Sequence, residues 1–256
     1  MSTNFGAAAE DYARFRAGFP PSLFDRLEGL GFAGVGRTVV DVGTGTGTLA
    51  RGYALRGATV IGVDPDSRML DQARSLDEAE AVAIEYRVGG AEELPVADGV
   101  ADLITAGQCW HWFDAPRAAA EFARISKPDG RVVIAHFDWL PLPGNVVEGT
   151  ERLIKQHNPA WRFDGGNGFH PGCIPHLHAA GFRQFETFSY DVDVPYSPEA
   201  WRGRIRASAG VGASLPPDRV RAFDAAHARL LAEAFPGEAV EVPHRVFVVL
   251  ARRRQA

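Results

Sequence analysis

The chain has 256 residues, 46% of them hydrophobic and 23% charged, so it can bury the core of one large domain. Its formal net charge of −5 gives no sign of nucleic acid as a partner, and no apolar run is long enough to span a membrane. The first ten residues lack the basic and apolar regions of a secretory signal. The only cysteines, Cys109 and Cys173, then fit free thiols, and we expect a cytoplasmic protein.

Strand and helix patterns alternate through the first half of the chain. Residues 8–35 predict amphipathic helices interrupted at Pro20-Pro21. Five short apolar runs predict strands, and helical patterns separate most of them: the strands are 38–42, 58–63, 84–88, 101–106 and 131–136, with helices over 47–56, after Ser67, and over 115–126. Residues 127–130 predict a tight turn. This alternation is typical of a doubly wound parallel α/β sheet.

The pattern loosens after residue 137. A helix is predicted over 171–180, a strand over 183–190, helical structure over 198–235 with a break at Pro216-Pro217, and a last strand over 244–251. We therefore expect a single domain 1–256 in which 1–36 form lid helices and 37–137 form the ligand-binding half. Insertions at 138–182 and 191–240 then form a cap over the substrate site.

The first strand leads into three glycines at alternate positions, Gly43, Gly45 and Gly47. Only glycine readily tolerates such a tight turn, and it lets a ligand lie directly on the backbone. The N–H groups of the following helix point toward that ligand. Open parallel sheets bind ligands at this edge, where Asp64 ends the neighbouring strand. A carboxylate there accepts hydrogen bonds from ribose hydroxyls, which favours an adenosine-type ligand.

Two departures from a dinucleotide-binding motif favour a nucleoside without phosphates. The G-x-G-x-x-G fingerprint requires glycine at position 48, which is Thr48 here. An acidic residue, Asp41, also precedes the first glycine, where a pyrophosphate would be repelled. A nicotinamide-dependent oxidoreductase, the alternative of another class, is therefore less well supported.

D-x-G-x-G-x-G after a strand, followed by an acid that ends the second strand, resembles the class I S-adenosylmethionine-dependent methyltransferases. Ala91-Glu92-Glu93-Leu94-Pro95 resembles the family's A-E-x-L-P turn, and 127–130 resembles its L-x-P-G-G turn. Tyr12-Ala13-Arg14-Phe15-Arg16 and Gln108-Cys109-Trp110-His111-Trp112-Phe113 are similar to motifs of the trans-aconitate methyltransferase-like subgroup. The resemblance covers residues 10–136 well and the later half only in outline.

The resemblance implies a Rossmann-like, mostly parallel seven-stranded sheet with an antiparallel last strand. S-adenosyl-L-methionine is the implied cofactor, and S-adenosyl-L-homocysteine its product. The residues implied to contact it are Tyr12, Arg16, Asp41, Gly43, Thr44, Gly45, Asp64, Pro65, Ala91, Glu92 and Gln108. The acid that usually precedes A-E is replaced by Gly89-Gly90, so Glu92 or a backbone carbonyl would have to receive the adenine amino group.

Methyl transfer is an in-line displacement that requires a positioned nucleophile and the exclusion of water. His111 is the candidate general base, because it follows the fourth strand and imidazole titrates near neutral pH. The alternative is a histidine that only holds its loop through hydrogen bonds.

All five tryptophans lie after residue 100, on the side expected to hold the substrate. An aromatic lining suits a flat or apolar acceptor, although individual tryptophans also serve as core residues. We expect five residues to contact the substrate: Trp112, Phe113, Trp139, His170 and Trp201.

Other polar clusters carry weaker hypotheses. Arg202 and Arg206 share a helix face and could bind a substrate carboxylate or be solvated. His170, Cys173, His176 and His178 fit an amphipathic helix better than a metal site, and no metal is expected. Cys109 lacks a neighbouring base, so a buried structural thiol is favoured over a nucleophile.

We expect methyl transfer to an aromatic or apolar small molecule, with a carboxylate of a small organic acid as the alternative acceptor. Methylation of nucleic acid or protein is less well supported, because no Asn/Asp-Pro-Pro-Tyr signature and no basic stripe is present. A further possibility is a family member that keeps the nucleoside-binding site but has a different chemistry or no enzymatic activity. The acceptor atom and the oligomeric state are left open.

Overall fold

The computed structural model describes residues 15 and 17–253. Tyr12 and Arg16, both expected at the cofactor, lie outside these described residues. The chain divides into two compact units. Among the described residues, unit 1 comprises 15, 17, 138–169 and 191–245, and unit 2 comprises 18–137, 170–190 and 246–253. No helix in the described ranges is long and apolar enough to cross a membrane.

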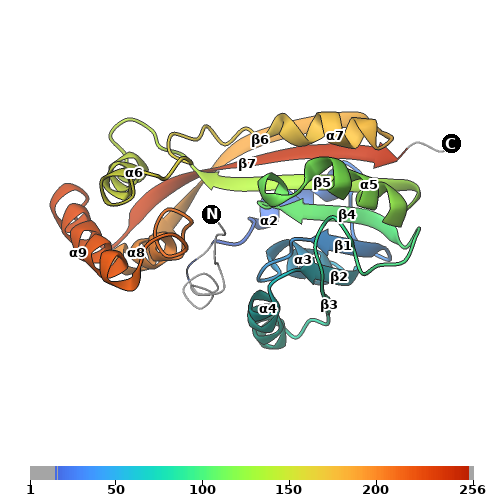
Figure 1. Cartoon of the computed structure of the whole chain (residues 1–256), viewed down its shortest axis with the longest axis horizontal. Coiled ribbons are helices and arrows are strands. Elements are labelled where there is room, and N and C mark those ends of the chain that lie inside the picture. Colours follow the sequence, from blue (N-terminus) through green and yellow to red (C-terminus); the bar gives the residue numbers. More distant parts are fainter. Residues whose placement is uncertain (1–14, 16, 254–256) are drawn as a thin grey trace. The chain divides into compact units, whose positions relative to one another are not determined.

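Within the described part of the chain, seven strands form one sheet in the order β3-β2-β1-β4-β5-β7-β6. The strands are β1 (Thr38–Val42), β2 (Thr59–Asp64), β3 (Glu85–Val88), β4 (Ala101–Gly107), β5 (Ser126–Trp139), β6 (Phe182–Tyr196) and β7 (Val240–Arg253). β1 pairs in parallel with β2 and β4, as do β2 with β3 and β4 with β5. β7 runs opposite to β5 (Figure 1). This confirms the predicted mostly parallel, seven-stranded sheet.

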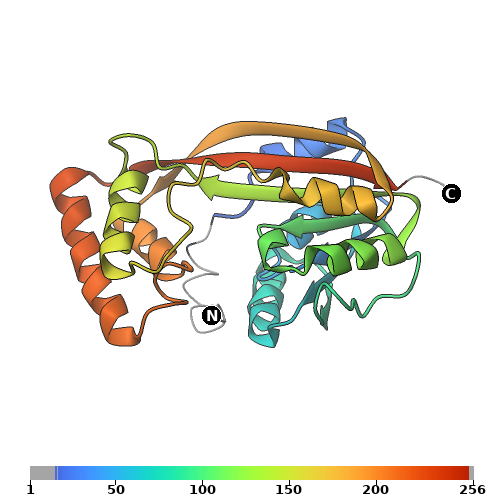
Figure 2. The ribbon, with the colours of Figure 1, turned by 45° about the horizontal axis from the view of Figure 1, so that its top comes forward.

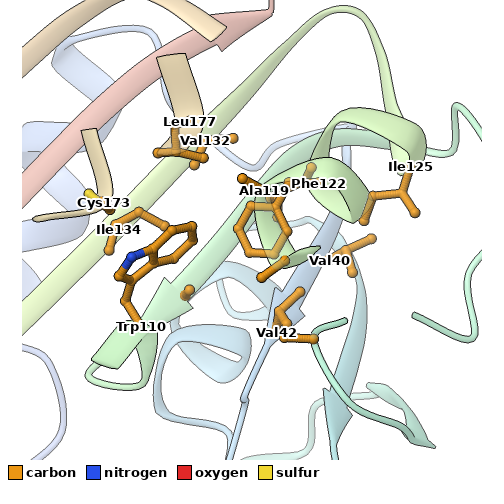
Figure 3. Close-up of a cluster of buried hydrophobic side chains, with 14 of the residues drawn as sticks. Val40, Val42, Trp110, Ala119, Phe122, Ile125, Val132, Ile134, Cys173 and Leu177 are labelled. Atoms are coloured by element: carbon orange, nitrogen blue, oxygen red, sulfur yellow. The ribbon is translucent and has the colours of Figure 1, made fainter. Parts of the chain in front are cut away.

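The helices of unit 2 are α2 (Pro21–Gly29), α3 (Thr48–Ala54), α4 (Ser67–Glu80), α5 (Ala115–Ile125) and α7 (Ile174–Ala179), with short 3₁₀ turns η2 (Trp110–Trp112) and η3 (Pro171–Cys173). α5 begins at the cap Asp114, whose carboxylate accepts from the Arg117 N–H. Val40 and Val42 of β1 belong to the same buried cluster as Phe122 of α5 and Leu177 of α7 (Figure 3). This core fixes the strand ends that carry the candidate site.

α2 is part of the packed body of unit 2, although residues 1–36 are predicted to be lid helices. Leu23, Phe24 and Leu27 are buried, and the Phe24 ring meets Tyr53 of α3 edge-on at 5.5 Å between centroids. A Cβ at Gly52 would collide with the Phe24 ring. The close approach of α2 to α3 therefore requires glycine at position 52.

The turn predicted at 127–130 is an interruption within β5. Ala101 of β4 is opposite Ser126, whereas Leu103 is already opposite Arg131. The extra residues therefore form a bulge, in which Asp129 has a φ of 60°. Proline and glycine at these positions indicate a break in regular pairing, but they do not say whether the strand resumes beyond it.

Unit 1 is built around helices α6 (Val146–His157), α8 (Pro198–Arg206) and α9 (Pro217–Ala234). α6 and α9 lie side by side in both views (Figures 1 and 2). Side-chain caps at Asn145 and Ser197 start α6 and α8. The predicted break at Pro216-Pro217 is the start of α9. Buried Trp201 and Phe223 are central to a separate hydrophobic core.

Candidate functional site

The glycine turn joins β1 to α3 in unit 2. Gly43, Gly45 and Gly47 have φ angles of 66°, 55° and 79°, a region that other residues rarely adopt. A Cβ at Gly43 would lie 2.8 Å from the Cys109 sulfur, and one at Gly47 would lie 2.5 Å from the Tyr86 hydroxyl. The turn therefore needs glycine for both conformation and space, which leaves its backbone bare toward a ligand.

The carboxylate of Asp41 shapes this turn from within. It accepts hydrogen bonds of 2.6 Å from the hydroxyls of Thr44 and of Thr105 on β4. Burial raises the pKa of Asp41 to about 6, against the opposing effect of these hydrogen bonds. Asp41 and the Thr44 side chain therefore hold β1, β4 and the turn together.

Asp64 lies at the carboxyl end of β2, next to the turn. One carboxylate oxygen accepts from the Gly45 N–H at 2.9 Å, and the other accepts from the Asp66 N–H at 2.9 Å. Burial raises the pKa of Asp64, although these two hydrogen bonds lower it. Each oxygen keeps a further lone pair for an additional donor. Pro65 follows directly and fixes the chain direction toward α4.

The predicted adenine contacts follow β3. Ala91 is buried, whereas Glu92 accepts a hydrogen bond of 2.8 Å from the Asp114 N–H at the start of α5. The Glu92 carboxylate thus joins the A-E turn to the loop after β4. Gln108, which directly follows β4 and has a φ of 58°, donates a hydrogen bond from its side-chain amide to the Phe137 carbonyl.

His111 lies in the η2 turn, among other aromatic rings. Its ring centroid is 4.7 Å from that of Trp112 and 6.4 Å from that of His136 at the end of β5. Trp112 is 44% exposed, so it can meet a ligand, whereas Phe113 packs against Trp110 of the core. These side chains come from the loop that immediately follows β4.

His136 belongs to the same group of rings, although it was not among the residues predicted from the sequence. It is 3% exposed, and its ring stacks on that of His170 at 3.9 Å between centroids and an interplanar angle of 16°. The structure therefore brings together three imidazoles that are far apart in sequence: His111, His136 and His170. A polar residue at the carboxyl end of a predicted strand was the signal that could have found His136.

The histidines and the cysteine at residues 170–178 do not come together as one metal site. Cys173 and Leu177 are part of the core of unit 2, and burial raises the pKa of the Cys173 thiol to about 12. Among the described residues, Cys173, His176 and His178 belong to no group with the spacing of metal ligands, whereas His170 lies beside His136 in a group that has this spacing.

The two tryptophans of unit 1 that are predicted to contact the substrate, Trp139 and Trp201, differ in burial. Trp201 is 0% exposed and donates from its indole N–H to the Thr150 hydroxyl at 3.0 Å. We therefore assign Trp201 to the core of unit 1, which corrects its prediction as a substrate contact. Trp139 is half-buried, donates to Glu151 at 2.8 Å and meets Trp201 edge-on at 5.5 Å.

The two arginines considered as carboxylate ligands have acidic partners in unit 1. Arg202 and Arg206 both pair with Asp224 of α9 and with Glu199 of α8. These ion pairs lower the pKa of Asp224 despite its partial burial. The shared face of α8 thus binds α9.

The residues of unit 2 fit an adenosine-type cofactor. The bare glycine backbone at 43–47 and the Asp64 carboxylate lie at the same edge, because β1 and β2 are parallel neighbours. The donor set consists of a carboxylate and backbone N–H groups, which suits ribose hydroxyls. Arg51, which contacts this turn at the Thr46 carbonyl, is paired with buried Asp77, so its charge is already used within the fold and does not suit a pyrophosphate.

Comparison with known proteins shows what kind of domain this is. Residues 40–134 match the methyltransferase domain family. A putative type II methyltransferase from Anaeromyxobacter dehalogenans shares the fold with a TM-score of 0.63, at 20% identity over 94% of this chain and 98% of that one. A Haemonchus contortus phosphoethanolamine N-methyltransferase solved with S-adenosyl-L-methionine has a TM-score of 0.56, at 18% identity over 99% and 57% of the two chains. The chain thus has the fold of the class I S-adenosylmethionine-dependent methyltransferases.

Curated relatives agree with this class. An uncharacterized methyltransferase of Mycobacterium tuberculosis is 39% identical over 132 residues, covering 52% of this chain and 51% of the relative. A malonyl-[acyl-carrier protein] O-methyltransferase of Pectobacterium atrosepticum is 36% identical over 185 residues, covering 68% and 66%. The chain spans about half the length of the first of these relatives. Together the matches indicate that this chain contains a methyltransferase domain.

Proposed function

We propose that the protein is an S-adenosyl-L-methionine-dependent methyltransferase that acts on a small molecule. The observation that carries the proposal is the glycine turn at 43–47, with Asp64 hydrogen-bonded to its backbone, inside the segment that matches a methyltransferase domain. The sequence motifs of residues 12–16 and 108–113 support a place in the trans-aconitate methyltransferase-like subgroup.

In this proposal Asp64 binds the ribose hydroxyls, and the backbone of Gly43 and Gly45 supports the remainder of the nucleoside. Asp41 acts through its hydrogen bonds with Thr44 and Thr105, which hold the glycine turn in the conformation that exposes its backbone to the ligand. Ala91 with Glu92 borders the adenine, and Gln108 closes the edge after β4. Bound S-adenosylmethionine supplies an electrophilic methyl group on a positively charged sulfur.

The aromatic side chains around His111 support an aromatic or apolar acceptor. The exposed Trp112 provides a flat apolar surface, and aromatic faces also favour a sulfonium charge. His111 is the proposed general base for an acceptor hydroxyl or carbon acid, taking its proton on a ring nitrogen. His136 and His170 line the same cluster and position the neighbouring loops.

Methyl transfer to a carboxylate is a second candidate, supported by one relative. The Pectobacterium enzyme is named as an O-methyltransferase of a malonyl group, which carries a carboxylate. A carboxylate nucleophile needs no base, so this candidate predicts that loss of His111 leaves the chemical step largely intact.

Ligand binding tests the proposed function directly. S-adenosyl-L-homocysteine should raise the melting temperature of the protein, because it binds the folded state only, whereas NADH at the same concentration should not. Stabilisation by NADH alone would overturn the proposal. The variant His111→Gln should still bind S-adenosyl-L-homocysteine. In methyl-transfer assays with a panel of small acceptors, its kcat should fall by about 10²-fold or more if His111 is a base. An unchanged pH profile of kcat would remove that role.

A further inference from the structure

Two imidazoles and a carboxylate come together toward the end of β5. The rings of His136 and His170 stack at 3.9 Å between centroids, with an interplanar angle of 16°. Asp138 follows His136 by two residues on the same strand. The potential ligand atoms of these three side chains all lie within 4.8 Å of one another. Imidazole nitrogen and carboxylate oxygen are donors that divalent transition metals commonly accept in proteins.

The strand itself places two of the three donors. Side chains at alternate positions of a β-strand point to the same face, so His136 and Asp138 are neighbours on one face of β5. This relation is local, because both residues lie within one continuous strand. The third donor, His170, caps the start of η3 and is brought to His136 within unit 2.

The spacing of the donors is close to that of a metal site. Ligand atoms around a tetrahedral zinc ion are about 3.4 Å apart, given bond lengths of about 2.0–2.1 Å. The side chains must therefore turn to bring ligand atoms from at most 4.8 Å apart to about this separation. His136 is 3% exposed, so packing fixes its ring. His170 reaches the surface, where its ring can turn and where an ion can enter.

The type of donor restricts the ion. Mg²⁺ and Ca²⁺ prefer oxygen ligands, whereas imidazole suits Zn²⁺ and its neighbours among the transition metals. Neither cysteine is in the group of ligands found among the described residues, so thiolate does not contribute. Three protein ligands leave the fourth position of a tetrahedral ion to water.

We propose that His136, Asp138 and His170 bind one divalent transition-metal ion, with Zn²⁺ or Co²⁺ as suitable ions. The ion joins the end of β5 to the segment that enters η3. This proposal goes beyond the methyltransferase function and does not depend on it. It replaces the expectation that no metal is bound, which considered His170 only together with the cysteine and histidines at 173–178.

Titration calorimetry of the full chain, treated first with a chelator, tests the site with Zn²⁺ alone. We expect one Zn²⁺ per chain. His170→Gln and Asp138→Asn should each weaken binding by about 10²-fold or more, because loss of a ligand costs at least as much as loss of its hydrogen-bond partner. Co²⁺ in place of Zn²⁺ should give the visible spectrum of nitrogen and oxygen ligation, without a thiolate charge-transfer band.

His178→Gln is the matched control, because His178 is an exposed histidine of the same segment that lies outside the group. It should bind Zn²⁺ as tightly as wild type. The proposal fails if wild type binds no Zn²⁺, if His170→Gln keeps the wild-type affinity, or if His178→Gln loses as much affinity as His170→Gln. A thiolate band with Co²⁺ would also overturn it.

The two test positions are chosen so that the result does not depend on folding. His136 is buried and is left unchanged, whereas Asp138 and His170 are less buried. A hydrogen-bonded cluster of the three side chains without metal is the alternative, and it predicts no binding of Zn²⁺ by wild type. S-adenosyl-L-homocysteine binding, measured on the same preparations, shows separately whether the proposed function stands.

Discussion

The two units of the molecule use buried polar groups in opposite ways. In unit 2, buried Asp41 accepts from two hydroxyls and Asp64 from two backbone N–H groups. In unit 1, Thr150 joins the Trp201 indole to the Nε2 atom of His227, but the buried Nδ1 atom of His227 has no partner among the described residues. Unit 2 thus uses polar groups to shape a backbone, whereas unit 1 uses them to fix aromatic side chains.

The largest effect is expected when a side chain is introduced into the glycine turn of unit 2. Gly43→Ala should weaken binding of S-adenosyl-L-homocysteine by about 10²-fold or more and destabilise unit 2 by about 2–4 kcal/mol. The new Cβ would lie 2.8 Å from the Cys109 sulfur, at a φ of 66° that alanine resists. Titration calorimetry and urea unfolding measure the two effects.

Gly99→Ala is the control for Gly43→Ala, because Gly99 also has a positive φ, of 61°, but has open space where the new side chain would lie. Within the described part of the chain, no atom beyond its two chain neighbours comes within 4 Å of the place that a Cβ would take. The substitution should cost only about 1 kcal/mol of stability and leave ligand binding unchanged. Equal loss of binding in both variants would show that the space beside Cys109 does not matter.

His227 sets how unit 1 responds to acid. Burial lowers the pKa of His227 from 6.5 to about 4, so the unfolded chain binds the proton more tightly than the folded one. Its contribution to stability is therefore complete above pH 6.5 and is lost as the pH falls toward 4, by about 3 kcal/mol. His227→Gln should remove this loss.

Urea unfolding of wild type and His227→Gln at several values between pH 4 and 7 measures the effect. The difference between their unfolding free energies should change by about 3 kcal/mol across this range. A constant difference would mean that His227 is protonated equally well in the folded and unfolded chain.

Asp41 gives unit 2 the opposite dependence on pH, with an effect of similar size. Its folded pKa of about 6 exceeds the unfolded value of 3.8, so its contribution is complete below pH 3.8 and is lost as the pH rises to 6. The loss amounts to about 3 kcal/mol. Asp41→Asn cannot ionise, and its unfolding free energy should rise relative to wild type between pH 4 and 6.5. If the unfolding free energies of the two proteins change equally between pH 4 and 6.5, Asp41 is not buried as a neutral acid.

Much of unit 2 was predictable because local pattern and tertiary role agree there. The run Val39-Val40-Asp41-Val42 is apolar on both faces of a parallel strand, and the strand is found at the expected residues. The prediction of a turn before the strand at Lys127 to Gly130 was inaccurate. Proline and glycine there indicate a break in regular strand pairing, but they do not show that β5 continues on both sides of the break. The strand ending at residue 190 was predicted too short, although polar and apolar residues continue to alternate to Tyr196.

The candidate site was predictable where chemistry is carried by the backbone, and less so where it depends on side-chain packing. Glycines at 43, 45 and 47 indicate a positive φ directly. Nothing local distinguishes Trp201, a core residue, from the half-buried Trp139, or His170, which lies beside His136, from His178. These differences arise from contacts between helices and strands that are distant in sequence.

The hydrogen bond from Gly45 to Asp64 has a kinetic consequence. The turn and its acid are already joined, so a nucleoside that reaches them has little chain to order before it binds. Encounter then resembles docking to a rigid surface, and association should be fast and nearly the same for related nucleosides. Related nucleosides would then differ mainly in their dissociation rates. This edge of the sheet would therefore select its ligand by residence time.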